Sequence, residues 1–252
     1  HNLVHIYRVN MYWTTNNKFS LRFIQYLQFF FLVFLKLTYL HIKCKYDVIQ
    51  THNLPDFLVF STLIPKILGA QIILDIHDLM PEFFQTRVGS DKKKFLLKLV
   101  FLQERLSCKF ADCVITVTEH WRQKLINRGV ALNKIIVVMN LADQKHFHSI
   151  PFFRLGKPDR FCLFYHGSMP YHYGLDLVLK AMIKLRNQIP IIYFRLVGYG
   201  EARNDLIKMA KELQLDNHVE FINSQPAERL QGLIETADVA VVPYLDDPFT
   251  DS

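Results

Sequence analysis

The sequence has few cysteines, and none is spaced for a metal site or a redox-active pair. Only four occur among 252 residues, at Cys44, Cys108, Cys113 and Cys162, with no CxxC motif and no His or Cys cluster at metal-ligand spacing. These absences exclude a small disulfide-stapled scaffold and favour a reducing, cytoplasmic setting. The chain starts at His1, and no signal-peptide pattern follows it.

A long uncharged run is also missing. Between Arg22 and Lys36 lie the 13 uncharged residues 23–35, whereas a membrane-spanning helix needs about 20 predominantly apolar residues. This comparison predicts that the segment does not cross a bilayer. Internal repeats and low-complexity tracts are absent as well, and the composition excludes a collagen-like fibre and a disordered chain.

The chain does contain a large share of apolar residues and an uneven distribution of charge. Half of the residues are hydrophobic and 21 are Phe, so a large core is available, and the length predicts one large domain or two modest ones. Residues 1–150 carry 19 basic and 10 acidic side chains (+9), and residues 151–252 carry 11 and 13 (−2). This contrast predicts that only the first half faces an anionic partner.

Apolar runs and breakers alternate in the pattern of strands followed by helices. We expect strands at residues 4–9, 48–51, 71–76, 114–117, 135–138, 161–166, 191–197, 219–222 and 239–242. We expect helices at residues 18–42, 55–68, 92–110, 119–127, 175–187, 202–213 and 227–236. This alternation predicts an α/β fold with parallel sheets. Residues 142–160 contain Pro, Gly and charged residues and lack a clear apolar periodicity. We therefore expect an N-terminal domain at 1–145, a linker at 146–160 and a C-terminal domain at 161–252.

Polar residues follow two strands of the first half. His77 and Asp78 come directly after the strand at 71–76, and His52 follows the strand at 48–51. Ligands of open α/β sheets bind beyond the carboxyl ends of the strands. A histidine there can donate a hydrogen bond to a substrate or accept a proton near neutral pH. A histidine that caps a helix or is hydrogen-bonded in a crowded loop gives the same pattern, and this alternative is stronger for His52.

Two glycine-containing loops follow strands of the second half. Gly198, Gly200 and Glu201 stand between a strand and a helix, where glycine lets the backbone approach a ligand and a helix N-terminus favours an anion. Gly167 and Gly174 flank another such loop, whose amides could cradle a diphosphate. A tight turn with a purely structural role explains each loop equally well.

The motif Gly198-Tyr199-Gly200 also has the form of the first part of the dinucleotide fingerprint GxGxxG. Its third glycine position holds Arg203, so the fingerprint is broken. A nucleotide-dependent oxidoreductase is therefore only a weak alternative.

A basic cluster opens the apolar helix expected at residues 92–110. It consists of Lys92, Lys93, Lys94 and Lys98. Helices of this kind lie on anionic membrane surfaces, and together with the +9 charge the cluster predicts a cytoplasmic protein, peripheral at the inner face of the plasma membrane. A solvated end of a core helix gives the same pattern. Nucleic acid is not expected as a partner, because the aromatic residues lie within apolar runs rather than among Arg and Lys.

Seven segments, in order along the chain, resemble one enzyme family. The resemblance to the N-terminal domain of family-4 (group 1) glycosyltransferases rests on YDVIQTHNLPDFL, QIILDIHDLMPEFF, ADCVITVTEHWRQKLINRGV and KIIVVMNLAD. The resemblance to their sugar-nucleotide-binding C-terminal domain rests on FYHGSMPYHYGLDLVLKAM, FRLVGYGEARNDLIKMA and VEFINSQPAERLQGLIETADVAVVPY. It implies the GT-B fold, two Rossmann-like domains facing across a cleft. It also implies a hexosyltransferase that moves sugar from a nucleotide-sugar with retention of configuration, without a metal or another cofactor.

The resemblance implies roles for individual residues. His77 matches the histidine that contacts the transferred sugar, which makes it the catalytic candidate, and His52 and Asp78 lie on the acceptor side. The implied donor-binding residues are Gly167, Ser168, His172, Gly174, Gly198, Gly200, Glu201 and Asn223. The basic half and the apolar helices favour a lipid-linked or polysaccharide acceptor.

Two departures from the family pattern bear on activity. Ser168 and Tyr173 stand where the family's diphosphate loop carries an Arg and a Lys, although the adjacent His172 could compensate. In the family pattern a pair of carboxylates follows shortly after Tyr244, and here this pair is expected beyond Ser252. The family's first strand, with its Gly-rich turn, also has no counterpart in this sequence. We therefore expect a fragment, truncated at both ends, that binds donor poorly and is inactive alone. A degenerate GT-B binding module and a nucleotide-sugar epimerase stay open as alternatives.

Overall fold

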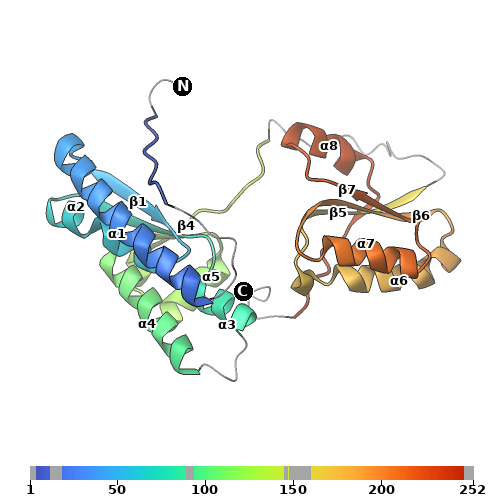
Figure 1. Ribbon diagram of the computed structural model, residues 1–252, viewed down its shortest axis with the longest axis horizontal. Helices are drawn as coiled ribbons and strands as arrows, with labels where there is room; N and C mark the ends of the chain where they lie inside the picture. Colours follow the sequence, from blue (N-terminus) through green and yellow to red (C-terminus); the bar gives the residue numbers. More distant parts are fainter. Residues whose placement is uncertain (1–3, 12–18, 89–93, 145–146, 148–159, 247–252) are drawn as a thin grey trace. The chain divides into compact units, whose positions relative to one another are not determined.

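The computed structural model of the chain describes residues 4–11, 19–88, 94–144, 147 and 160–246. The chain divides into two compact units between Asn140 and Leu141. Each unit contains a four-stranded parallel sheet, so the predicted α/β class is confirmed (Figure 1). Most of the segment that was predicted to be a linker, residues 146–160, lies outside the described residues.

The sheet of the first unit has its strands in chain order. They are β1 (Val48–His52), β2 (Gln71–Ile76), β3 (Cys113–Thr116) and β4 (Ile135–Val137). Strand β2 lies inside the sheet, and its residues Ile72, Leu74 and Ile76 are at most 1% exposed. Because side chains alternate across a strand, these three share one face, and that face packs into the core of the unit. Asp75 points to the other face, where the candidate site is built.

The helices of the first unit are α1 (Phe19–Cys44), the 3-10 helix η1 (Asp56–Thr62), α2 (Leu63–Ile67), α3 (Met80–Val88), α4 (Lys94–Phe110), α5 (Glu119–Asn127) and the 3-10 helix η2 (Leu132–Lys134). Of these, η1, α4 and α5 contribute buried residues to the core against the sheet. Helix α1 lies against η1 and α2 (Figure 1). Helix α5 starts where the Thr118 hydroxyl accepts a hydrogen bond from the Trp121 amide at 3.1 Å, and it ends just before Gly129, whose φ is +92°.

Helix α1 is longer than the uncharged stretch at residues 23–35, on which the prediction against a membrane span was based. Lys36 and Lys43 lie within it and do not interrupt it, and residues 23–44 form one helix long and apolar enough to cross a membrane by length and composition. The length argument against a span is therefore wrong. Core helices of soluble proteins and signal sequences pass the same test, but only 11% of the apolar window in α1 is buried. The helix thus presents a largely uncovered apolar surface.

The second unit has helices on both faces of its sheet. Its strands are β5 (Phe161–Ser168), β6 (Ile192–Tyr199), β7 (Val219–Ile222) and β8 (Val239–Ala240), in the order β7-β6-β5-β8. Its helices are the 3-10 helix η3 (Tyr171–Tyr173), α6 (Leu175–Gln188), α7 (Arg203–Glu212) and α8 (Ala227–Glu235). Helices α6 and α7 pack on one face and α8 on the other (Figure 1). Strand β6 is buried on both faces, so its sequence IYFRLVGY is apolar except for Arg195, which forms an ion pair with Glu220.

Three sequence predictions about single elements are wrong. The strand predicted at residues 4–9 does not form, because this segment pairs with no strand in the part of the chain that the structure describes and is mostly exposed. The single helix predicted at 55–68 is a 3-10 helix followed by a short α-helix. Helix α3 was not predicted at all. It is a nine-residue helix with Pro81 in its first turn, a position that proline tolerates because the amide there needs no helical partner.

Candidate functional site

The candidate site of the first unit lies at the carboxyl ends of β1 and β2. The two strands run parallel with His52 opposite Asp75, and His77 follows Asp75 by two residues, so all three side chains lie on one face. His52 Nδ1 lies 3.0 Å from His77 Nε2 and 3.3 Å from Asp75 Oδ2, and His77 Nε2 lies 3.4 Å from the same oxygen. The two rings stack at a centroid distance of 5.2 Å. The structure therefore joins two predicted site residues through a carboxylate that sequence analysis had assigned only to a strand.

Asp75 is the buried member of this cluster. Its side chain is 10% exposed, whereas those of His52 and His77 are 58% and 40% exposed. Gln50 lies two residues before His52 on the same face, and its amide nitrogen donates to Asp75 Oδ2 at 2.7 Å. The hydrogen bond from Gln50 thus fixes the orientation of the Asp75 carboxylate, while both imidazoles are exposed to solvent.

Asn53 holds the loop that carries His77 and Asp78. Its side-chain oxygen accepts a hydrogen bond from the His77 amide at 2.9 Å, and its nitrogen donates to the Asp78 carbonyl at 2.6 Å. The same nitrogen donates to Asp56 Oδ1 at 2.9 Å. Burial raises the pKa of the Asp78 carboxyl, and the neighbouring His77 opposes this shift. Asn53 is thus a positioning residue that sequence analysis missed, although it lies in a loop that the strand pattern had marked.

Buried carboxyl groups lie beneath the loop. Asp56 is 1% exposed, and burial raises its pKa to about 6 against the hydrogen bonds from the amides of Asn53 and Gln103. Glu104 of α4 is also 1% exposed, and burial raises its pKa to about 7 although Arg128 donates to both of its oxygens at 3.0 and 3.1 Å.

Arg128 also connects the helix that follows the loop. Its guanidinium forms an ion pair with Glu82 of α3, and Lys124 lies 3.6 Å from the same carboxylate. These contacts tie α3 to α4 and to the end of α5. They therefore hold helix α3, which follows His77 in the chain, against α4 and the end of α5.

The corresponding edge of the second sheet is built from backbone. Strands β5 and β6 pair so that Gly167 faces Gly198, and a Cβ atom on Gly198 would lie 1.9 Å from the Gly167 carbonyl oxygen. A Cβ atom on Gly200 would lie 2.5 Å from the Met169 nitrogen, and the Met169 amide donates to the Tyr199 carbonyl at 2.8 Å. The two predicted glycine loops are thus brought together, in contact too close for side chains.

Helix α6 begins at this edge. Gly174, its N-cap, has a φ of +67°, and a Cβ atom there would lie 2.2 Å from the Pro243 carbonyl oxygen. Next to it the Tyr173 ring packs on the Tyr244 ring at a centroid distance of 4.2 Å, and the His172 ring meets Tyr173 edge-on at 4.9 Å. Tyr173, at the position where the family pattern has a lysine, therefore makes an aromatic contact with Tyr244.

The remaining predicted donor residues lie around the same edge. Ser168 ends β5 and is exposed, and its carbonyl accepts a hydrogen bond from the Tyr165 hydroxyl at 2.5 Å. Asn223 follows β7, one residue beyond the pairing of Ile222 with Val197, and is exposed. Glu201 is exposed in the turn between β6 and α7.

Arg203 is a second residue that sequence analysis did not assign to the site. It was interpreted only as the break in a dinucleotide fingerprint, yet it is the first residue of α7, directly after the glycine loop. Its Nε atom is buried and has no hydrogen-bond partner among the residues that the structure describes. A buried cationic donor without a partner is costly, so Arg203 is a candidate for contact with an anion.

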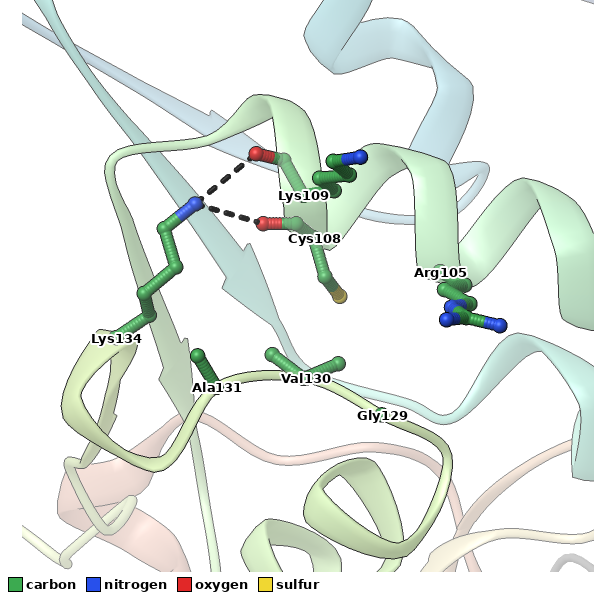
Figure 2. Close-up of a pocket in the computed structure, with 7 residues that line it drawn as sticks. All are labelled: Arg105, Cys108, Lys109, Gly129, Val130, Ala131 and Lys134. Carbon is green, nitrogen blue, oxygen red and sulfur yellow. Dashed lines mark hydrogen bonds between the residues drawn. The ribbon is translucent and has the colours of Figure 1, made fainter.

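Figure 2 shows a pocket away from these edges, between the end of α4 and the segment that follows α5. Its volume is about 230 Å³, and its lining includes Arg105, Lys109 and Lys134. The Lys134 ammonium donates to the carbonyls of Lys109 at 3.0 Å and Cys108 at 3.5 Å, and also to that of Ala111. Lys134 therefore caps the carbonyls that end α4, and the pocket has a structural explanation.

The predicted membrane-surface cluster is only partly described. Lys94 and Lys98 are exposed on α4, and Lys92 and Lys93 lie outside the described residues. The exposed apolar residues of α4 are Phe95, Leu99, Leu102 and Leu106. Their spacing of three and four residues places them along one stripe of the helix. The basic end of α4 thus adjoins an exposed apolar stripe.

Two parallel α/β sheets, one with polar side chains at its carboxyl edge and one with glycine loops there, define the GT-B-like class of protein. Residues 2–146 match the family described as glycosyltransferase family 4, and residues 149–250 match the glycosyl transferases group 1. The chain belongs to this family of group 1, family-4 glycosyltransferases, as its motifs predicted.

A curated relative and a solved structure are similar to the chain. The putative colanic acid biosynthesis glycosyl transferase WcaI of Escherichia coli (strain K12) is 27% identical over 190 residues, which cover 71% of this chain and 46% of WcaI. Sucrose-phosphate synthase (tll1590) from Thermosynechococcus elongatus has a TM-score of 0.65 at 22% identity, covering 87% of this chain and 56% of that one.

A third similar protein, Alr3699/HepE of Anabaena, was solved in complex with UDP. It has a TM-score of 0.63 at 17% identity, and the match covers 84% of this chain and 56% of that one. The two structural matches show the fold. The chain spans about half the length of the curated relatives it matches.

Proposed function

We propose that the protein is a retaining hexosyltransferase that takes its sugar from a nucleotide-sugar, without a metal ion in the transfer step. The observation that carries the proposal is the close backbone approach at the carboxyl edge of the second sheet. There Gly198 and Gly200 leave no room for side chains, and helices α6 and α7 begin beside them. Exposed amides at helix N-termini are suited to bind a diphosphate. The complex of HepE with UDP is consistent with a UDP-type donor, and a GDP-type donor is the other candidate.

His77 is the residue that we assign to the reacting sugar. Its imidazole is 40% exposed, and its backbone amide is fixed by Asn53. In this proposal the imidazole donates a hydrogen bond to the donor sugar while the diphosphate leaves. The charge that develops on the diphosphate is stabilised by the amides around Gly167, Gly174 and Gly198, and Arg203 supplies a cation near them. His52 and Asp78 are assigned to the acceptor side.

The proposal is tested by separating donor binding from turnover. The full-length protein is titrated with UDP- and GDP-sugars, and donor consumption is then followed with lipid-linked and glycan acceptors. We expect His77→Ala to lower turnover by about 100- to 1,000-fold and to leave donor affinity nearly unchanged. His120→Ala, a change of an exposed histidine on α5, is the matched control and should leave both unchanged. Failure of every nucleotide-sugar to bind, or full turnover by His77→Ala, would contradict the proposal.

A binding module without catalysis is the second candidate. It is favoured by Tyr173, whose ring packs on Tyr244 where a lysine is expected, and by Ser168, which brings no charge. Donor binding without turnover with any acceptor would support this candidate. Turnover of donor in the absence of acceptor would instead indicate an epimerase.

We also propose that the acceptor is a lipid-linked or polysaccharide intermediate and that the protein works as a peripheral protein at the cytoplasmic face of the plasma membrane. WcaI is named for colanic acid biosynthesis, which is consistent with a glycan acceptor. Helix α1 exposes apolar side chains at four-residue intervals from residue 23 to residue 39, namely Phe23, Leu27, Phe31, Leu35 and Tyr39. Such a stripe can enter the boundary between headgroups and acyl chains while Lys94 and Lys98 of α4 contact anionic lipid.

Vesicle binding tests the membrane contact. We expect the chain to sediment with anionic vesicles at low salt, and Phe31→Ser with Leu35→Ser to weaken this binding. Lys180→Ser, a change on an exposed face of α6, serves as the control and should not. Release by high salt indicates a peripheral protein, and retention at high salt indicates that α1 spans the bilayer. Absence of binding to the vesicles at any salt concentration would overturn the proposed membrane contact.

A further inference from the structure

We propose that His52, Asp75 and His77 form a binding site for one divalent transition-metal ion, with Zn²⁺ as the ion of best fit. Among the described residues, these three offer one ligand atom each within 4.8 Å of one another. Two imidazoles and a carboxylate are ligands that zinc accepts. His52 is distant in the sequence from Asp75 and His77, and the register of β1 against β2 brings it beside them.

The distances between the ligand atoms fit a single ion. They are 3.0 Å between the two nitrogens and 3.3 and 3.4 Å from each nitrogen to Asp75 Oδ2. Ligands bound about 2.0–2.1 Å from a tetrahedral zinc ion lie about 3.3 Å from one another. One ion can therefore contact all three atoms with no rearrangement of the backbone.

The charges around the cluster favour a cation. Asp75 is nearly buried, and among the described residues it forms no ion pair with Lys or Arg. A cation bound by the same three atoms would therefore be its charge partner.

The surroundings supply the second layer of a metal site and leave one side open. Gln50 donates to the ligating oxygen of Asp75 at 2.7 Å and so orients the carboxylate. Both histidines are partly exposed, at 58% and 40%, so water can take the fourth position. The bound ion would occupy His77 Nε2 and withdraw it from a donor sugar, so we infer an inhibitory rather than a catalytic ion. The ion site itself does not depend on the proposed transferase activity.

The test measures metal binding without donor or acceptor. Untagged, metal-free protein is titrated with Zn²⁺ by calorimetry, and Co²⁺ is used as a spectroscopic probe of coordination. We expect one ion per chain and the intense visible absorption of four-coordinate Co²⁺. His52→Ala and Asp75→Asn should each lower Zn²⁺ affinity by about 100-fold or more, and Gln50→Ala by about 10-fold. His120→Ala is the matched control and should change nothing.

His52→Ala provides a second test in case Asp75→Asn does not fold. His52 is more than half exposed, so His52→Ala should fold normally even if the loss of the buried Asp75 is disruptive. Zn²⁺ should also raise the unfolding temperature of the wild type and not that of His52→Ala. Binding that is absent, or equal in the wild type and His52→Ala, would overturn the site and leave a simple hydrogen-bonded pair. Either result leaves the test of donor binding untouched.

Discussion

The two sheets present the same edge in opposite ways. At the carboxyl edge of the first sheet, side chains from β1 and β2 converge, and His52, Asp75 and His77 lie within 3.4 Å of their neighbours. At the carboxyl edge of the second sheet, Gly167 and Gly198 bring backbone against backbone. The first edge can bind a cation through its side chains, and the second offers mainly backbone amides, with Arg203 beside them. In the proposed transferase, the first edge would contact the reacting sugar and the second would bind the diphosphate.

This comparison makes distinct predictions for the two units. Changes at the second edge should act through steric conflict, because there is no space for a Cβ atom. Changes at the first edge should act through hydrogen bonds and protonation, because its parts are polar side chains, some of them buried.

The largest effect is expected for Gly198→Ala in the second unit. Its Cβ would lie 1.9 Å from the Gly167 carbonyl oxygen, and the φ of +145° is one that side chains rarely adopt. Strain and overpacking of this kind each cost about 1–3 kcal/mol, so we expect a loss of about 3 kcal/mol or more. Urea unfolding measures the loss, and nucleotide binding should fall with it.

The control for this change is Gly232→Ala in helix α8. Its Cβ would meet nothing within 4 Å, and alanine favours a helix over glycine by about 1 kcal/mol. The control should therefore be neutral or stabilising. Unchanged stability and unchanged nucleotide binding in Gly198→Ala would show that the second edge tolerates side chains, and the comparison would fail.

The next effect concerns the pH dependence of the first unit. The pKa of Asp56 is about 6 when folded and 3.8 for the free side chain, because burial disfavours the charged form. The folded state therefore binds the proton more tightly. Protonation of Asp56 thus stabilises the folded state, and this contribution to the free energy of unfolding is complete below about pH 4 and is lost as the pH rises through 6. The shift corresponds to about 3 kcal/mol.

Asp56→Asn removes this titration and keeps an oxygen that can accept the hydrogen bond from Asn53. Compared with the wild type, the variant should lose less stability between about pH 4 and pH 7. Glu104 of α4 interacts electrostatically with Asp56, and its pKa of about 7 gives a remaining slope of the same sign. Asp216→Asn, which changes an exposed carboxylate, is the control. If the pH profiles of Asp56→Asn and the wild type have the same slope, Asp56 does not titrate as described.

Some of the fold could be predicted because its signals are local. Strand β2 was predicted with its observed bounds from the apolar run at Gln71–Ile76. Helix α5 was predicted with its observed bounds, and it is delimited by a Thr118 cap and a following Gly129. The glycine loops could be located for the same reason, since each follows an apolar strand directly.

The polar edge of the first sheet could be located only in part. His52 and His77 were recognised from their places after strands, but their contact depends on strand register, which no local pattern specifies. Asp75 was hidden inside the strand pattern. Asn53 and Asp56 act through hydrogen bonds to residues that sequence analysis had not connected with them. Long-range pairing, and not residue type, is what remained unpredictable.

The smallest effect is expected for Asn53→Ala at the first edge. The change removes the hydrogen bonds to the His77 amide, the Asp78 carbonyl and the buried Asp56 carboxyl, and each net hydrogen bond contributes about 1 kcal/mol. Because the His77 amide and the Asp78 carbonyl are only partly buried, water can replace part of their loss, and we expect destabilisation of about 2 kcal/mol. Thermal unfolding measures it.

The two edges should respond differently to this last change. Without Asn53 the loop that carries His77 loses its fixed backbone, so transfer should weaken, while nucleotide affinity at the glycine loops should stay the same. Asn133→Ala, at an exposed position in η2, is the control and should change stability by no more than about 0.5 kcal/mol. A parallel fall in nucleotide affinity would mean that Asn53 also supports the donor loops. The division between a side-chain edge and a backbone edge would then be wrong, because one residue would serve both.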